Sequence, residues 1–290
     1  MTPSAPAPVS TVPGEGGLPK AVAVAHDGAR VEVYVHGAHV TSWHPSGSAE
    51  DRLYQSPKSP FADGLPIRGG IPVCFPQFAD QGPLPAHGFA RDRAWTPTFA
   101  GRTATGAAQV RMELRDSAAT RSLWPHAFAC ELVATAQGPQ LEVAFAFTNT
   151  GHAPFAVTAA LHSYLRVHDV RATWIEGLSG ARYRDKRLRK DDLLEAAPAL
   201  TLHDPLDRVY YVVPAELRVQ EPQRALAIAA AGSTDTVVWN PGPPGGPGPH
   251  DMPDDGYLYM LCVEAAIARA PLTLAPGVTH RLVQTLTARP

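Results

Sequence analysis

The chain has 290 residues, with 25 lysines and arginines against 27 aspartates and glutamates, so its formal net charge is −2. A nearly neutral chain lacks the basic face that a nucleic-acid partner requires, and it gives no reason to expect binding to an acidic membrane surface. The 3 cysteines are odd in number and form no Cys-x-x-Cys pair. We therefore expect reduced thiols in a cytoplasmic protein, without a thiolate zinc site.

Residues 1–20 are rich in proline, serine, alanine and glycine, which predicts a flexible leader. The leader has no basic segment followed by an apolar stretch, so we expect no signal peptide. No later run is long and apolar enough to suggest a transmembrane helix. The remaining residues, 21–290, show no shift in composition, and we expect them to form a single β-sandwich domain.

From residue 22 onward, apolar and polar residues alternate with a period of two, which predicts β-strands separated by turns. The segments with this pattern are 22–43, 108–116, 129–151, 155–167, 208–213, 225–232, 235–240, 257–266 and 280–288. The sequence AQGPQ at 136–140 predicts a hairpin turn. Helical patterns are confined to two short segments, 122–128 and 190–197. The fold class predicted from these patterns is all-β, a large antiparallel sandwich or barrel with few short helices.

Residues 67–91, IRGGIPVCFPQFADQGPLPAHGFAR, place tandem glycines and four prolines between Arg68 and Arg91. One interpretation is a disordered linker. The other is a stiff loop that holds two guanidinium groups for an anion such as phosphate, because prolines restrict the backbone and glycines permit conformations closed to other residues. Nearby acids that could pair with either arginine instead are Asp63, Asp80 and Asp92.

Two of the predicted strands carry residues able to do acid–base chemistry. If residues 155–167 form one strand, His162 and Tyr164 share a face with small residues. This histidine could bind a ligand, or it could be half-buried and satisfied by a backbone carbonyl. In the strand 257–266, Glu264 ends an apolar row, where burial would raise its pKa toward the range of a general base. It could equally lie at the end of the strand and reach water.

Two other features are less specific when taken alone. Asp207 lies next to Arg208, just before a predicted strand, which is typical of a surface ion pair or a turn. The proline- and glycine-rich segment 240–256 could be a linker between domains. Strands of the same pattern flank it on both sides, which favours a long surface loop within one domain.

In chain order the sequence contains RGGIPVCFPQF, LPAHGFAR, LHSYLRV, IEGLSGARYRDK, DRVYY, VVWNP with DMPDDGY, and LCVEAA. This series resembles the D-hexose-6-phosphate mutarotases, a branch of the aldose 1-epimerase family, and with the flanking strands it covers nearly the whole chain. The resemblance implies a large antiparallel β-supersandwich of the galactose-mutarotase type. Two features depart from the family pattern. Ala265-Ala266 stands where many members have Pro-Gly, and the insertion at 241–249 is longer than expected.

The resemblance also implies roles for six residues. The general acid would be His162 and the general base Glu264, starting as a protonated imidazole and an ionised carboxylate. Substrate-binding residues would be Arg68, His87, Arg91 and Asp207, with the two arginines at the phosphate and the other two at the sugar.

The function implied is interconversion of the α and β anomers of a hexose 6-phosphate by acid–base opening and reclosure of the ring. Such a reaction requires no cofactor and no metal, and the family suggests a monomer whose partner is the hexose 6-phosphate substrate. One alternative is an aldose 1-epimerase that acts on unphosphorylated sugars. Another is a non-catalytic carbohydrate-binding protein on the same scaffold.

Overall fold

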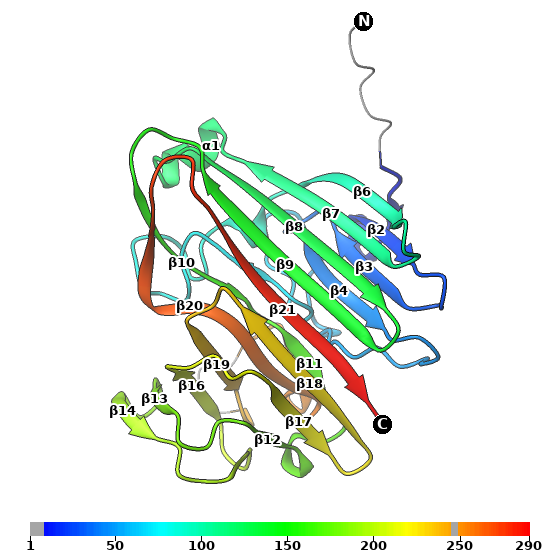
Figure 1. Ribbon diagram of the computed structural model, residues 1–290, viewed down its shortest axis with the longest axis vertical. Coiled ribbons are helices and arrows are strands. Elements are labelled where there is room, and N and C mark those ends of the chain that lie inside the picture. Colours follow the sequence, from blue (N-terminus) through cyan, green and yellow to red (C-terminus); the bar gives the residue numbers. More distant parts are fainter. Residues whose placement is uncertain (1–8, 245–248) are drawn as a thin grey trace, which may run out of the picture.

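The computed structural model describes residues 9–244 and 249–290 of the chain. Within these ranges 21 strands form three sheets, and the single α-helix, α1 (Ala118–Leu123), is short (Figure 1). The named strands pair in antiparallel fashion, as in β10 with β20 and β8 with β9, so the predicted all-β, antiparallel fold is confirmed. No helix in this part of the chain is long and apolar enough to cross a bilayer.

A four-stranded sheet with the order β1-β2-β3-β4 comes first along the chain. Its strands are β1 (Val12–Pro13), β2 (Pro19–Val24), β3 (Arg30–Tyr34) and β4 (His39–His44). Val12 lies opposite Lys20 across the β1–β2 pair. Residues 12–20, which were expected to belong to a flexible leader, therefore contain paired strands, and residues 1–8 lie outside the described residues.

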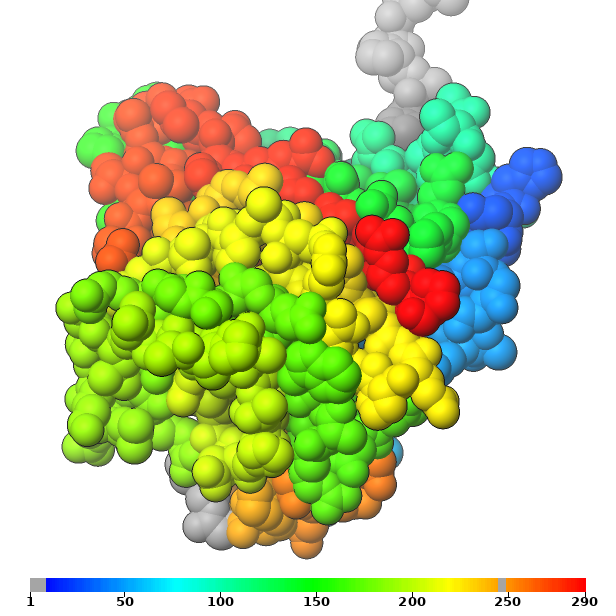
Figure 2. Space-filling view, turned by 60° about the horizontal axis from the view of Figure 1, so that its bottom comes forward, coloured from blue at the N-terminus to red at the C-terminus, as the bar shows by residue number. Residues whose placement is uncertain are grey.

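A nine-stranded sheet has the order β15-β12-β17-β18-β21-β9-β8-β7-β6. Its strands are β6 (Thr96–Arg102), β7 (Ala108–Arg115), β8 (Phe128–Gln137), β9 (Gln140–Asn149), β12 (Trp174–Glu176), β15 (Ala199–Thr201), β17 (Leu217–Glu221), β18 (Arg224–Ala231) and β21 (Thr279–Arg289). The predicted hairpin at 136–140 joins β8 to β9, with Gln137 opposite Gln140. The C-terminal strand β21, red in Figure 2, lies beside the yellow β18.

An eight-stranded sheet has the order β14-β13-β16-β19-β20-β10-β5, and β11 also pairs with β20. Its strands are β5 (Val73–Cys74), β10 (Phe155–Leu161), β11 (Tyr164–Arg166), β13 (Arg182–Asp185), β14 (Lys190–Leu194), β16 (Leu206–Tyr210), β19 (Asp235–Asn240) and β20 (Met260–Leu274). The segment 155–167 is thus two strands with a break at residues 162–163, where one continuous strand was expected.

Both helix predictions need correction. The segment 190–197 begins with the edge strand β14, because pairing with β13 overrides its weak helical pattern. The helix α1 lies mainly before the expected 122–128. It starts after Ser117, which forms a capping box with Thr120, and it ends before Pro125. Short 3-10 helices occur at Glu15–Gly17, Ala90–Asp92, Val170–Ala172 and Gly256–Tyr259.

The two faces of the eight-stranded sheet have different environments. Leu161, Val263 and Ile267 belong to the large apolar core that also draws residues from the other two sheets. Ala160 and Ala266, which alternate with them along the strands, belong to a smaller apolar cluster on the opposite face. That opposite face carries the candidate site, so the side chains of the site and of the core alternate along the same strands.

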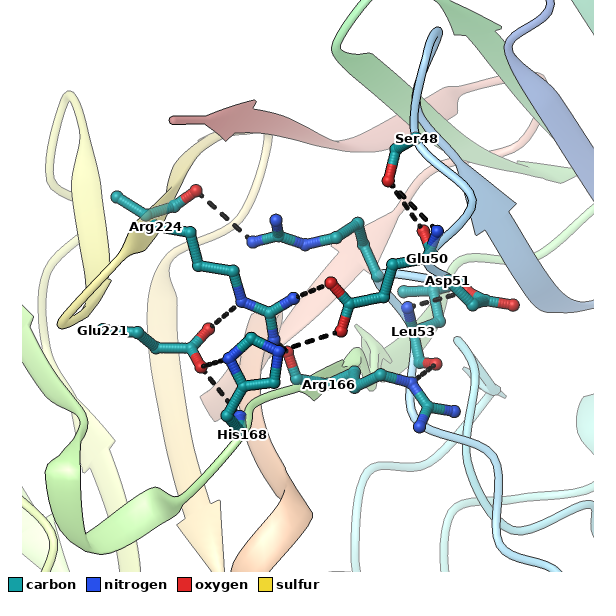
Figure 3. A network of polar contacts seen from close by, with 10 residues as sticks. Ser48, Glu50, Asp51, Leu53, Arg166, His168, Glu221 and Arg224 are labelled. Carbon is teal, nitrogen blue, oxygen red and sulfur yellow. Dashed lines mark hydrogen bonds and ion pairs between the residues drawn. The ribbon is translucent and has the colours of Figure 1, made fainter.

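A charged network joins the segment before Leu53 to the hairpin formed by β17 and β18 (Figure 3). The buried Arg224 donates hydrogen bonds to Glu50, to Glu221 at 2.6 Å and to the carbonyl oxygen of Arg166 at 3.2 Å. His168 lies between the two acids, at 3.2 Å from Glu50 and 3.3 Å from Glu221. Arg224 therefore holds three segments that are distant in sequence.

Candidate active site

His162 and Glu264 are cross-strand neighbours on the face of the eight-stranded sheet that lies away from the main core. The register pairs Leu161 with Ala265 and Tyr164 with Cys262, which places His162 opposite Glu264. The Nε2 atom of His162 is 3.5 Å from Oε1 of Glu264, and both side chains are buried. Directly opposed side chains on one face of an antiparallel pair lie close together, so strand register alone brings this imidazole to this carboxyl.

The electrostatics of the pair in the substrate-free protein favour two neutral groups. Burial lowers the pKa of His162 well below its usual value, and the positive charges of Arg68 and Arg91 contribute to this. Burial, together with the charge of Asp207, raises the pKa of Glu264 well above its usual value. Both shifts oppose the protonated His162 and the ionised Glu264 that the resemblance implies as the starting state of the reaction.

The two remaining polar atoms of the pair are unengaged. Among the described residues, Nδ1 of His162 and Oε2 of Glu264 are buried and have no hydrogen-bond partner. Buried polar atoms normally have partners, and leaving one without a partner is costly. The two unpartnered atoms are therefore candidate contacts for a hydroxyl or an ether oxygen of a ligand.

His87 lies against His162, with ring centroids 5.3 Å apart in an edge-on arrangement. Its Nδ1 accepts a hydrogen bond from the backbone N–H of Ala79 at 3.3 Å, and the Sγ atom of Cys74 lies 3.1 Å away. Burial lowers the pKa of His87 to about 3. Burial also raises the pKa of the Cys74 thiol, which therefore stays protonated and can donate to Nδ1 alongside the N–H of Ala79. His87 is thus a neutral imidazole whose proton is on Nε2.

Tyr164 connects the catalytic candidates to Arg68. Its ring stacks on His162 with a centroid distance of 4.8 Å and an interplanar angle of 10°. Its hydroxyl accepts a hydrogen bond from Nη1 of Arg68 at 2.7 Å, and Nε of Arg68 donates to Asp251 at 2.9 Å. The partner of Arg68 is thus Asp251, which is 183 residues away in the sequence.

The loop that carries Arg68 is rigid for reasons visible at its tandem glycines. Gly69 and Gly70 have φ values of 117° and 56°, in the region that favours glycine. A Cβ at Gly69 would lie 2.4 Å from the carbonyl oxygen of Tyr54, and one at Gly70 would lie 2.2 Å from that of Val40. The carbonyl oxygen of Gly69 also accepts a hydrogen bond at 2.7 Å from Nε2 of the buried His39. Of the two interpretations of residues 67–91, the structure corresponds to a fixed loop.

Arg91 lies at the other end of the same loop. Its Nη2 donates to the carbonyl oxygen of Ala86 at 2.8 Å, and its Nε is 3.8 Å from Oδ1 of Asp92. Its positive charge lowers the pKa of both His87 and His162, as does the charge of Arg68. The two guanidinium groups therefore act on the same pair of imidazoles.

Asp207 lies on the same face, two strands away from Glu264. The register places Asp207 opposite Trp239, and Trp239 opposite Cys262, which is two residues from Glu264 on β20. Strands lie about 4.8 Å apart and residues about 3.4 Å apart along a strand, so the backbones of Asp207 and Glu264 are separated by roughly 12 Å. Burial raises the pKa of Asp207, while Lys186, with Nζ at 3.3 Å, opposes that shift.

Sequence reasoning brought the six candidate residues into view but missed several residues beside them. Trp239 lies edge-on to both His162 and Tyr164, with centroid distances of 6.0 and 5.9 Å. The missed residues Lys186, Trp239 and Asp251 all lie in the quoted motifs ARYRDK, VVWNP and DMPDDGY.

Residues 245–248 of the 241–249 insertion lie outside the described residues. Ala265 and Ala266 continue strand β20 and form no turn.

The antiparallel β-sandwich thus presents a buried imidazole beside a buried carboxyl, a pair suited to acid–base chemistry. A crystal structure titled "putative mutarotase (YeaD)" from Salmonella typhimurium superposes on the protein with a TM-score of 0.84 at 34% identity, covering 94% of this chain and 90% of the other. Residues 20–287 match the aldose 1-epimerase family. The chain therefore belongs to the aldose 1-epimerase family.

Two relatives carry a more specific name, "Putative glucose-6-phosphate 1-epimerase". The one from Salmonella typhimurium (strain LT2) is 35% identical over 270 residues, covering 91% of this chain and 89% of the relative. The one from the plant Cenchrus ciliaris is 34% identical over 276 residues, covering 91% of this chain and 83% of the relative.

Proposed function

We propose that the protein interconverts the α and β anomers of a hexose 6-phosphate, with glucose 6-phosphate as the expected substrate. The observation that carries the proposal is the cross-strand pair of His162 and Glu264, 3.5 Å apart on one sheet face. The ring oxygen and the C1 hydroxyl oxygen of a pyranose are bonded to the same carbon. A proton donor and a proton acceptor that lie side by side can therefore serve both oxygens at once.

Ring opening needs one group to protonate the ring oxygen while the other removes the proton of the C1 hydroxyl. The C1–O5 bond then breaks, and the free aldehyde rotates about C1–C2. Ring closure returns each proton along the reverse path, on the other face of the carbonyl. His162 and Glu264 together hold one transferable proton at the start of the cycle and one at its end. The reaction is therefore balanced without any other reactant. General acid–base catalysis of this kind raises the reaction rate by roughly 100- to 10,000-fold per positioned group.

A phosphate at Arg68 and Arg91 would also change the protonation of the pair. In the substrate-free protein their positive charges help to lower the pKa of His162. A bound phosphate dianion would offset those charges and favour transfer of the shared proton from Glu264 to His162. The substrate would thereby promote the acid His162 and the base Glu264 that the reaction uses.

The preference for a phosphorylated sugar is supported by the arginines and by the names of the relatives. Arg68 is held by Asp251 and Tyr164 through Nε and Nη1. Within the described residues no bond engages its Nη2, which can therefore donate to an anion. The phosphate is remote from C1, so these contacts would orient the substrate and would not take part in bond breaking. His87 and Asp207 would bind sugar hydroxyls.

The test is the rate of anomer exchange, measured by NMR exchange spectroscopy with glucose 6-phosphate, glucose and galactose in turn. We expect acceleration for the phosphorylated sugar. Equal or greater acceleration for the free sugars would favour an aldose 1-epimerase without phosphate specificity. Binding without acceleration would identify a carbohydrate-binding protein. Location in the cytoplasm and a monomeric state remain predictions.

Two variants assign the roles. Glu264→Gln keeps the shape of the side chain and should abolish exchange while substrate still binds. Arg68→Ala should mainly raise KM for glucose 6-phosphate, whereas Arg218→Ala, which removes an exposed arginine paired with Glu216, should leave KM unchanged. Retained exchange in Glu264→Gln would exclude this carboxyl as the base. Unchanged discrimination between glucose 6-phosphate and glucose in Arg68→Ala would exclude the phosphate contact.

A further inference from the structure

Gln284 is a buried residue of the nine-stranded sheet. From the core side, its amide contacts the segments that carry the two catalytic candidates. It lies on β21 and is 1% exposed. Its Nε2 donates a hydrogen bond to the carbonyl oxygen of Val263 at 2.9 Å, and its Oε1 accepts one from the hydroxyl of Ser163. The carbonyl of Val263 can only accept, which fixes the orientation of the amide.

The two contacted residues are immediate neighbours of the candidate catalytic residues. Ser163 follows His162, and Val263 precedes Glu264. Because side chains alternate along a strand, Ser163 and Val263 face the core while His162 and Glu264 face the site. Gln284 thus holds the core side of the same backbone that presents the acid–base pair.

The amide of Gln284 replaces a hydrogen bond that is missing from the β-ladder. In a regular antiparallel pair Ser163 and Val263 would exchange two hydrogen bonds. Here the N–H of Val263 donates to the oxygen of Ser163 at 3.2 Å, but the N–H of Ser163 turns to the oxygen of Leu161 at 3.1 Å. The N–H of His162 points away from β20 and donates to the oxygen of Pro72 at 3.1 Å, which continues the pairing of β10 with β5. The amide of Gln284 takes the place of the missing donor at Val263.

A buried polar side chain in a sandwich core is unfavourable unless every group is satisfied. Both ends of this amide have partners, and without it the carbonyl of Val263 and the hydroxyl of Ser163 would both be buried and unpaired. An apolar residue at position 284 would suit a regular ladder. The amide instead satisfies the polar groups left unpaired by the break between β10 and β11. His162 lies at that break and faces Glu264.

We propose that Gln284 is a positioning residue, which stabilises the strand break at residues 162–163 and thereby fixes His162 against Glu264. This inference rests on the proposed function, since the geometry that it maintains is that of the acid–base pair. Displacement of a reacting group by about 1 Å can reduce the rate roughly 100-fold. Loss of the amide should therefore lower kcat more than it changes KM, because Arg68 and Arg91 lie on a different segment.

The main variant is Gln284→Leu, which keeps most of the side-chain volume and removes both hydrogen bonds. The matched control is Asn149→Ala, another fully buried amide that donates to the carbonyl oxygen of Leu274 on the same strand β20, ten residues from Glu264. For Gln284→Leu we expect kcat to fall between roughly 10- and 100-fold with KM within about 3-fold. For Asn149→Ala we expect a lower Tm and an unchanged kcat.

A second variant keeps the test decisive if Gln284→Leu does not fold. Ser163→Ala removes one of the two bonds, and we expect a smaller fall in kcat, again without a matching rise in KM. Wild-type kcat in folded Gln284→Leu, or in Ser163→Ala when only that variant folds, would overturn the proposal. So would a loss of kcat in Asn149→Ala as large as that in the Gln284 variant.

Two further measurements separate this inference from the proposed function. If the wild-type protein does not accelerate anomer exchange, the proposed function fails regardless of Gln284. The ¹⁵N chemical shifts of the His162 imidazole, recorded without substrate, test the positioning alone. They should change in Gln284→Leu and stay unchanged in Asn149→Ala, and unchanged shifts in both would contradict the proposal.

Discussion

The buried imidazole of His39 should lower the free energy of unfolding at acidic pH, and the size of this effect follows from its pKa. Its Nε2 donates to the carbonyl oxygen of Gly69, so the proton lies on Nε2, and within the described residues Nδ1 has no partner. A second proton would have to go to that buried, unpartnered nitrogen. Burial accordingly lowers the pKa of His39 to about 3, from 6.5 for an exposed histidine.

A histidine whose pKa is lowered on folding binds protons more weakly in the folded than in the unfolded state. Its contribution to stability is complete above the unfolded pKa near 6.5 and is lost as the pH falls toward the folded value of about 3. At pH 5, about 1.5 units below the unfolded pKa and at about 1.36 kcal/mol per unit, the loss is about 2 kcal/mol.

The perturbation is His39→Gln, which places an amide donor near the position of Nε2 and removes the titration. Urea unfolding followed by tryptophan fluorescence at pH 7 and pH 5 gives four free energies of unfolding. Between pH 7 and pH 5 the wild-type protein should lose about 2 kcal/mol more than the variant. Equal losses in the two proteins would refute the assignment of a neutral, buried His39.

Two further predictions concern other parts of the structure. Arg224→Leu removes the guanidinium partner of the buried Glu221, which among the described residues keeps only its contacts with His168, and should lower the free energy of unfolding by about 3–5 kcal/mol in urea titrations. Arg218→Leu at an exposed pair should change it little. An equal effect of the two changes would contradict a structural role for the network in Figure 3. Tyr164→Phe keeps the stacked ring but loses the bond to Arg68, so KM for glucose 6-phosphate should rise roughly 10-fold in steady-state assays. An unchanged KM would show that Tyr164 does not orient that arginine.

The strand-rich architecture was predictable because its signal is local. Alternation with a period of two follows directly from the geometry of a strand with one face in the core. The hairpin at 136–140 was predictable for the same reason, since a two-residue turn between alternating segments needs only nearby residues. The segment 190–197 was predicted wrongly because β14 is an edge strand, defined by its partner β13 and hardly at all by its own sequence.

The partners of the candidate site residues were not predictable from nearby sequence. The acids considered for Arg68 were close in the chain, yet its partner is Asp251. The backbone carbonyl left unpaired at the break at residues 162–163 is satisfied by the amide of Gln284, and no local pattern marks that contact. The opposing pKa shifts of the pair could not be predicted either, because the sequence gives no measure of how completely both groups are desolvated.

The period of two that reveals the strands also explains why the core and the site depend on each other. When two catalytic candidates lie opposite each other on one face, the residues beside them must point to the other face. Here those residues are Ser163 and Val263, which are buried in the sandwich. A break in the ladder that aims His162 would leave a backbone group unpaired in that core, away from bulk solvent, which is costly. Gln284, a polar side chain from the opposing sheet, supplies the missing bond. A residue of β21 with no contact to the sugar therefore becomes part of what determines the geometry of the reaction.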